Sequence, residues 1–260
     1  MTEPRDDEFY VGYLPQAPPG IAARARWSVL LLLLLGVAAA LLLVSRQQRF
    51  DPGVFEFGVR RPLEGVVREN PYPALYIERP GTTAAGAGFS RFELVAFGKV
   101  GAASLVEGLD GRSVRLSGSL IYRQGRTMVE VEDGSIETID DRRLERRAGS
   151  WQGEVSDLGL RTLVGEIVDS KCFLGVMKPG RTKPHKACAI RCISGGIPPM
   201  LMVEDADGAA EFFLLTGGDG RAIHREVLDF VAEPVEISGR LRRHGDVYIL
   251  EIDPTTIRRI

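Results

Sequence analysis

The sequence is poor in the residues that most often carry chemistry: of its 260 residues, three are cysteine, three are histidine and five are lysine. It also lacks a large charge of either sign, because the formal net charge is −2, so no overall field favours nucleic acid or acidic lipid. Aromatic residues make up 7%, which is few for the stacking surfaces that bind single-stranded nucleic acid. No serine-type or carboxylate-pair mechanism has support in the sequence, and we expect no nucleic-acid partner.

The rare residues gather in one stretch, DSKCFLGVMKPGRTKPHKACAIRCISGGIPP, which runs from Asp169 to Pro199. This cysteine window contains every cysteine, four of the five lysines and one of the three histidines. Elsewhere Gly (30) and Pro (15) are frequent, which is typical of short strands joined by turns. We therefore expect the chemistry of the protein in the cysteine window.

One long apolar run, WSVLLLLLLGVAAALLLVS, covers Trp27 to Ser45. Nineteen helical residues span about 28 Å, close to the thickness of a bilayer core. A cleaved signal peptide would have a shorter run that ends at a small-residue site, whereas Ala38–Ala40 lie inside this run. A buried core helix would show a polar face. We expect an uncleaved membrane anchor.

The arginines that flank the anchor do not decide its orientation, since Arg24 and Arg26 precede it and Arg46 and Arg49 follow it. A short N-terminal tail before a large C-terminal region favours a single-pass protein of the inner membrane with periplasmic C-terminal domains.

The tail itself, residues 1–26, is acidic, then aromatic, then rich in proline, and we expect it to be extended. It is either a disordered leader or a docking strip for a membrane partner through Phe9, Tyr10 and Tyr13.

An internal repeat follows the anchor. VRLSGSLIYRQGRTMVEVEDGSIETI (Val114–Ile139) parallels VEISGRLRRHGDVYILEIDPTTIRRI (Val235–Ile260), and LEGVV (Leu63–Val67) parallels LVGEIV (Leu163–Val168). The Ser-Gly pairs of the first two segments lie 121 residues apart, but the glycines of the other two lie only 100 apart. The cysteine window is therefore an insertion into the second copy.

Each copy shows five strands with a helix between the third and the fourth, which is the order of an OB-fold barrel; another small barrel or a sandwich is the alternative. We expect a mainly β protein with an N-terminal transmembrane helix and two tandem five-stranded OB-like β-barrels, the second with an inserted helical Cys/His segment. The expected bounds are an extended tail 1–26, a transmembrane helix 27–45, a linker 46–61, a first barrel 62–139, a charged linker 140–161 and a second barrel 162–260 with the insertion 169–199.

OB folds bind ligands with the loops that join strands 1 and 2 and strands 4 and 5. The cysteine window is the 1–2 loop of the second barrel, and His244 lies in its 4–5 loop. The first barrel has only ENPYP (residues 69–73) in the matching 1–2 loop, so we expect it to be a spacer or a partner-binding module. His224 is expected to be a surface or packing residue on a short helix over residues 221–232.

The cysteine window predicts a helix that starts near Pro184 and ends at Gly195. His185, Cys188 and Cys192 then share one helix face, and Cys172 arrives from the preceding strand. Three thiolates and one imidazole are the ligands of a closed zinc site, although the spacing has only one close cysteine pair. A mixed-ligand iron–sulfur centre is a second possibility. The sequence has no C-x-x-C-H, which excludes a c-type haem.

Two other uses of the cysteines stay open. In an exported domain, a disulfide from Cys172 to Cys188 or Cys192 would staple the insertion to the barrel, whereas a bridge between Cys188 and Cys192 has poor geometry. Alternatively Cys188 or Cys192 is a nucleophile with His185 as its base.

Six cations lie between Lys171 and Met200, where the sequence has no carboxylate. Such segregation favours the binding of an anion or an acidic partner and lowers the pKa of a thiol, although a solvated basic loop has the same pattern. The predicted binding residues are Lys171, Lys178, Arg181, Lys183, Lys186 and Arg191.

The motif G-E-I-V-D-x2-C-F-x-G…H-x2-C-A-x2-C-I-x2-G-I-P, from Gly165 to Pro198, resembles an uncharacterised bacterial family of membrane-tethered or exported OB-like proteins. The resemblance implies an association with respiratory or redox systems. From it we expect a non-catalytic binding or accessory subunit of a membrane redox complex, with the lipid bilayer and other membrane or respiratory proteins as partners; a thiol-based redox enzyme is the alternative.

Overall fold

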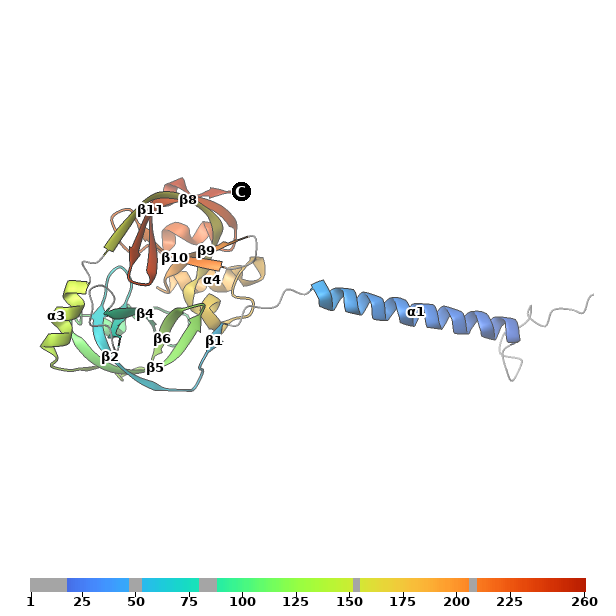
Figure 1. Cartoon of the computed structure of the whole chain (residues 1–260), viewed down its shortest axis with the longest axis horizontal. Helices are drawn as coiled ribbons and strands as arrows, with labels where there is room; N and C mark the ends of the chain where they lie inside the picture. Colours follow the sequence, from blue (N-terminus) through green and yellow to red (C-terminus); the bar gives the residue numbers. More distant parts are fainter. Residues whose placement is uncertain (1–17, 47–52, 80–87, 152–154, 206–209) are drawn as a thin grey trace, which may run out of the picture. The chain divides into compact units, whose positions relative to one another are not determined.

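The computed structural model describes residues 18–46, 53–79, 88–151, 155–205 and 210–260. The chain divides into two compact units, Met1–Phe50 and Asp51–Ile260. Among the described residues, the first unit holds one helix and the second holds all of the strands (Figure 1).

The helix α1 spans Pro19–Arg46 and begins earlier than expected, so the prediction of an extended tail up to residue 26 is wrong for its last part. The reason is local: proline suits the first helical position, and the alanines and arginines between Gly20 and Trp27 are strong helix formers. By length and composition α1 fits a membrane span, a test that a signal sequence near an N-terminus also passes. The proposed docking strip at Phe9, Tyr10 and Tyr13 lies outside the described residues.

Five strands close the first barrel. They are β2 Arg61–Arg68, β3 Ala74–Glu78, β4 Phe89–Val95, β5 Ser113–Arg123 and β6 Arg126–Val131. Neighbouring strands run antiparallel except β4 and β6, which pair in parallel and close the barrel. The short helix α2 Ala103–Val106 follows the third strand. This order is that of the OB fold.

The second barrel repeats the arrangement. Its strands are β8 Val155–Asp169, β9 Pro199–Glu204, β10 Ala210–Gly217, β11 Pro234–His244 and β12 Val247–Ile252. The third and fifth strands, β10 and β12, again pair in parallel. The predicted fold class is confirmed.

The insertion lies between β8 and β9 and consists of three short helical segments. They are a π-helical turn η1 Cys172–Val176, a 3-10 turn η2 Lys183–His185 and the α-helix α4 Lys186–Ser194. Gly195 follows α4, and its N–H group donates to the carbonyl of Arg191. The glycine signal in the sequence thus marks the end of this helix.

Both stretches expected as linkers contain regular structure. The helix α3 Arg142–Trp151 lies in the charged linker, because Leu144, Ala148 and Trp151 recur on one buried face beneath its many charges. β8 also begins inside that linker, and the short strand β1 Val54–Phe55 lies in the first one, paired with β5. A second short strand, β7 Glu137–Thr138, also pairs with β5.

The helix expected over residues 221–232 is only the 3-10 turn η3 Arg225–Phe230. Its N-terminal part is held in other contacts, because the N–H of Ile223 donates to the Tyr72 hydroxyl and Ala222 pairs with Thr216. The chain ends with the 3-10 turn η4 Pro254–Thr256 and the strand β13 Arg258–Arg259, which pairs with β11.

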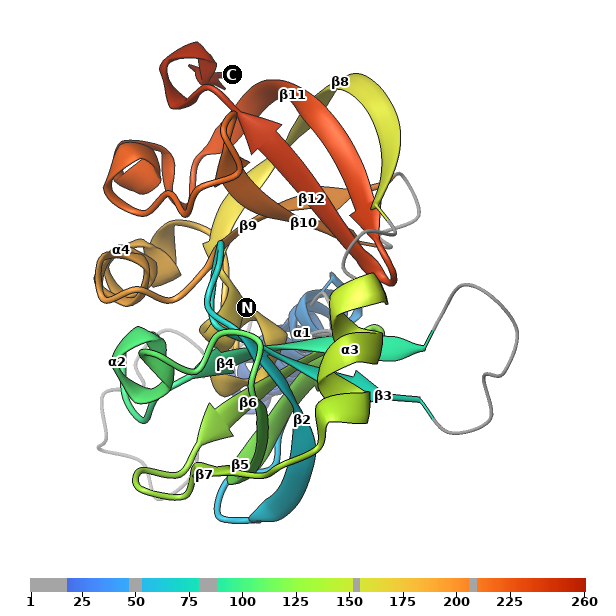
Figure 2. The same cartoon turned by 90° about the vertical axis from the view of Figure 1, so that its left-hand side faces the viewer.

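The two barrels are packed against each other, and α2 and α4 lie on the same side of the molecule (Figure 2). One buried apolar cluster joins residues of both barrels: Val95 and Met128 come from the first, and Cys172, Phe173 and Cys192 from the second. The first barrel is therefore not a detached spacer. It forms one wall around the cysteine window.

Candidate metal or thiol centre

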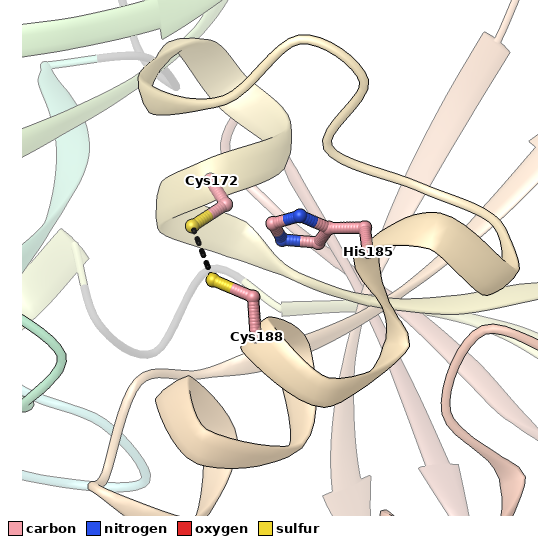
Figure 3. A group of neighbouring side chains, drawn as sticks. All are labelled: Cys172, His185 and Cys188. Carbon is pink, nitrogen blue, oxygen red and sulfur yellow. Dashed lines mark hydrogen bonds between the residues drawn. The ribbon is translucent and has the colours of Figure 1, made fainter.

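Three thiols meet at the start of the insertion. Cys172 follows β8 in η1, and Cys188 and Cys192 lie on α4. The Sγ atom of Cys172 is 3.9 Å from Cys188 Sγ (Figure 3). It is also 3.9 Å from Cys192 Sγ, and all three cysteines are free. Cys172 and Cys192 are buried, whereas Cys188 is partly exposed.

His185 is fixed beside these thiols by a carboxylate. Its Nε2 atom lies 3.0 Å from Asp169 Oδ2, and both side chains are buried. The other carboxylate oxygen, Oδ1, accepts a hydrogen bond of 2.8 Å from the backbone N–H of Cys172. A carboxylate in this position orients a ligating histidine and selects its tautomer. Asp169 is therefore part of the site.

The possible ligand atoms fall into two overlapping groups of three. The donor atoms of Cys172, His185 and Cys188 all lie within 4.8 Å of one another, as do those of Asp169, Cys172 and Cys192. Cys172 belongs to both groups. The four residues predicted as ligands thus lie in one neighbourhood, with Asp169 as a fifth member that the sequence analysis missed.

The hydrogen bond between Cys172 and Cys192 shifts the pKa values of these two thiols in opposite directions. A hydrogen bond from the Cys172 thiol lowers the pKa of Cys192, since it stabilises the thiolate. The same bond raises the pKa of Cys172, and burial raises it further. A single negative charge on the pair is therefore stabilised on Cys192 rather than on Cys172.

A lysine from the first barrel contacts the third thiol. Lys99, in the loop between β4 and α2, places Nζ 3.0 Å from Cys188 Sγ. The hydrogen bond to Cys188 raises the pKa of Lys99 and so keeps the ammonium form. Sequence reasoning missed this residue, although Lys99 is the one lysine outside the cysteine window.

Lys171 is wrongly predicted as a binding residue for an anion or a partner. Its side chain is 3% exposed, and its Nζ forms a 2.6 Å ion pair with Glu130 of β6. The same ammonium group donates to the carbonyls of Ala96 and Gly98 at 2.8 and 2.7 Å. All of these partners belong to the first barrel, so Lys171 connects the barrels and is not available to a ligand.

Two other residues predicted to bind an anion or an acidic partner form ion pairs with carboxylates of other segments. Arg181 pairs with Glu204 at 2.6 Å, and Lys186 pairs with Glu233 at 2.5 Å. Lys178, Lys183 and Arg191 are exposed. The basic character that the sequence suggests is therefore partly neutralised in the fold.

The other two histidines pack against aromatic rings. His244 stacks on Trp151 with a centroid distance of 4.3 Å, at the end of α3. His224 meets the Tyr72 ring edge-on at 5.3 Å. Neither is among the described groups of possible metal ligands. His224 thus has the packing role that the sequence indicates.

Comparisons with known proteins identify no family: no family model and no curated protein matches the sequence. One similar solved structure is a crystal structure of a deletion mutant of the single-stranded DNA binding protein from Thermus aquaticus. It is 15% identical, with a TM-score of 0.22, and the match covers 80% of this chain and 95% of that one. This match contradicts our exclusion of nucleic acid as a partner, and we withdraw the exclusion; a TM-score of 0.22 supports no argument about what this chain binds.

Proposed function

We propose that this protein is a membrane-anchored accessory subunit of a redox complex, and that its second barrel holds a zinc ion between the barrels. Cys172, His185 and Cys188 are the proposed ligands, with Cys192 as the fourth. The observation that carries the proposal is the position of Cys172 Sγ, 3.9 Å from both other sulfurs. Sulfur ligands 2.3 Å from a tetrahedral zinc ion lie about 3.8 Å apart. The resemblance of the window to membrane-tethered proteins of respiratory systems supports the redox setting.

The buried carboxylate–histidine pair adds support. A zinc-bound histidine commonly donates its second ring N–H to a carboxylate, and Asp169 lies 3.0 Å from His185 Nε2. With Nε2 engaged, Nδ1 is the nitrogen left for the metal. An iron–sulfur centre uses the same donor types and is the other metal-centre outcome of the tests below.

The proposed location is the inner membrane, with α1 as the anchor and the barrels in the periplasm. The length and apolar character of α1 support an anchor. Protease treatment of spheroplasts is the test: cleavage of the barrels in intact spheroplasts is expected, and protection until lysis would place them in the cytoplasm.

Metal content tests the site directly. The purified full-length chain in detergent is expected to contain one zinc ion per molecule by elemental analysis. Cys172→Ser should lose the ion, because Cys172 belongs to both ligand groups, whereas the exposed Lys183→Gln should keep it. Sulfide and iron in place of zinc would identify a cluster. Wild-type protein that binds neither, with three titratable thiols, would refute the metal proposal.

A thiol-based redox enzyme is the second candidate, favoured by the partial exposure of Cys188 beside the ammonium of Lys99. The Cys188 thiolate would attack a disulfide of a partner protein and release one of its thiols. Cys172 would then attack Cys188 Sγ, releasing the second partner thiol and leaving a Cys172–Cys188 disulfide. Asp169 engages His185 through Nε2, so Nδ1 is the ring nitrogen that would act as the base. Mass spectrometry after incubation with a disulfide substrate tests this: a loss of two hydrogens from the metal-free chain supports the enzyme, and an unchanged mass excludes it.

A further inference from the structure

A loop of the first barrel, residues 96–102, passes directly over the end of α4. The N–H of Gly101 donates to the carbonyl of Gly195 at 2.9 Å. A Cβ atom on either glycine would overlap a backbone oxygen, of Gly196 in the first case and of Lys99 in the second. Glycine at these positions therefore allows the two backbones to approach closely.

The same loop is held from its other side by the second barrel. Lys171 donates to the carbonyls of Ala96 and Gly98, which flank Phe97, and its charge is balanced by Glu130. Lys99 thus lies between two fixed points, at Gly98 and Gly101. A long, flexible side chain is usually poorly positioned on a surface, but here its backbone is fixed within one residue on one side and two on the other.

We propose that Lys99 is a positioning residue of the cysteine centre, which is complete only when the first barrel places this ammonium group 3.0 Å from the Cys188 sulfur. The inference extends the proposed function, on which it rests. A zinc ion with three thiolate ligands carries a net charge of −1, and a cation at hydrogen-bond distance from one sulfur offsets that charge.

Zinc affinity of the full-length chain, measured by competition with a chromophoric chelator, tests the role of Lys99. Lys99→Gln is expected to weaken zinc binding about fivefold, the upper end for a partly exposed ion pair. Lys99→Arg should restore affinity to within about twofold, since it keeps the charge. The matched control is Phe97→Ala on the same loop, whose side chain is 73% exposed, and it should leave affinity unchanged.

The outcomes separate this inference from the metal proposal. Equal affinity of wild type and Lys99→Gln would refute the role of Lys99 and leave the metal site standing. Equal losses in Lys99→Gln and Lys99→Arg would show a structural effect of the loop and would also refute it. If wild type binds no metal, the rate of Cys188 alkylation at pH 7 replaces zinc affinity as the readout. A rate at least threefold lower in Lys99→Gln, restored in Lys99→Arg, would support the role of Lys99 without the metal. Equal rates in wild type and Lys99→Gln would refute it.

Discussion

The 1–2 loops of the two barrels occupy equivalent places in the same fold but differ greatly in length. The loop of the first barrel, between β2 and β3, is short and projects Tyr72, whose hydroxyl donates to Leu215 O at 2.7 Å in the second barrel. The loop of the second barrel, between β8 and β9, is the cysteine window, and it projects Lys171 into the first barrel. Each barrel therefore inserts one side chain of its 1–2 loop into the other.

The comparison shows how one fold supports two roles. In an OB fold the 1–2 and 4–5 loops ordinarily bind ligands. Here the strand that follows one 4–5 loop meets the other loop, because Arg126 Nη1, at the start of β6, donates to Asp246 O at 2.5 Å. The short loop contributes a single docking residue, whereas the long loop has enough residues to dock and also to enclose three sulfurs. The site is thus built at the junction of the barrels rather than on one of them.

The largest expected effect comes from the docking residue of the long loop. Lys171→Met should destabilise the Asp51–Ile260 unit by about 3–5 kcal/mol, because it leaves Glu130 buried and unpaired. Lys171→Met combined with Glu130→Leu should recover part of the loss, since no isolated charge remains. Urea unfolding of this compact unit measures both, with the exposed Lys183→Met as the control. A loss below 1 kcal/mol for Lys171→Met would show that the barrels do not depend on this contact.

Removal of metal should lower the stability of the protein through the long loop and not through the short one. With zinc at one hundred times its Kd, chelation is expected to lower the stability by about 3 kcal/mol. The effect should vanish in Cys172→Ser, which lacks the ligand common to both groups, and persist in Tyr72→Phe, which alters only the short loop. Thermal unfolding with and without chelator checks this. An equal chelator effect in Cys172→Ser would locate the metal elsewhere.

The docking residue of the short loop should give a smaller effect. Tyr72→Phe keeps the buried ring but removes a hydroxyl that bonds Leu215 O and accepts from Ile223 N at 3.0 Å. The expected loss is about 1–2 kcal/mol in urea unfolding. Tyr72→Ala should cost about 3–5 kcal/mol, because it also leaves a cavity. Equal losses for the two variants would mean that the ring contributes nothing.

The repeat and the cysteine spacing made the twin barrels and the cluster of thiols predictable from sequence, because both are periodic or local patterns. Lys99 and Glu130 were not predictable as partners of the cysteine window, since they approach it only when the barrels dock. Asp169 is part of the motif, but its role in the site was missed because a lone carboxylate carries no spacing signal. The helix α3 was not predicted because most of its residues are charged or small, and only Leu144, Ala148 and Trp151 mark its buried face.

The smallest effect concerns His244, the last residue of β11 before the 4–5 loop of the second barrel, and it depends on pH. Burial lowers the pKa of His244 below its ordinary value of 6.5, so the unfolded chain binds more protons than the folded one below that pH. Burial of neutral His244 therefore leaves the stability of the folded chain unreduced above about pH 6.5, and stability is lost as the pH falls below that value. His244→Phe keeps a ring against Trp151 and should flatten the stability curve between pH 7 and 5 by about 1 kcal/mol. His224, whose pKa burial also lowers, retains its own share of the slope in this variant. If the two curves were parallel, His244 would have to be protonated equally in both states, and its burial at the barrel junction would be wrong.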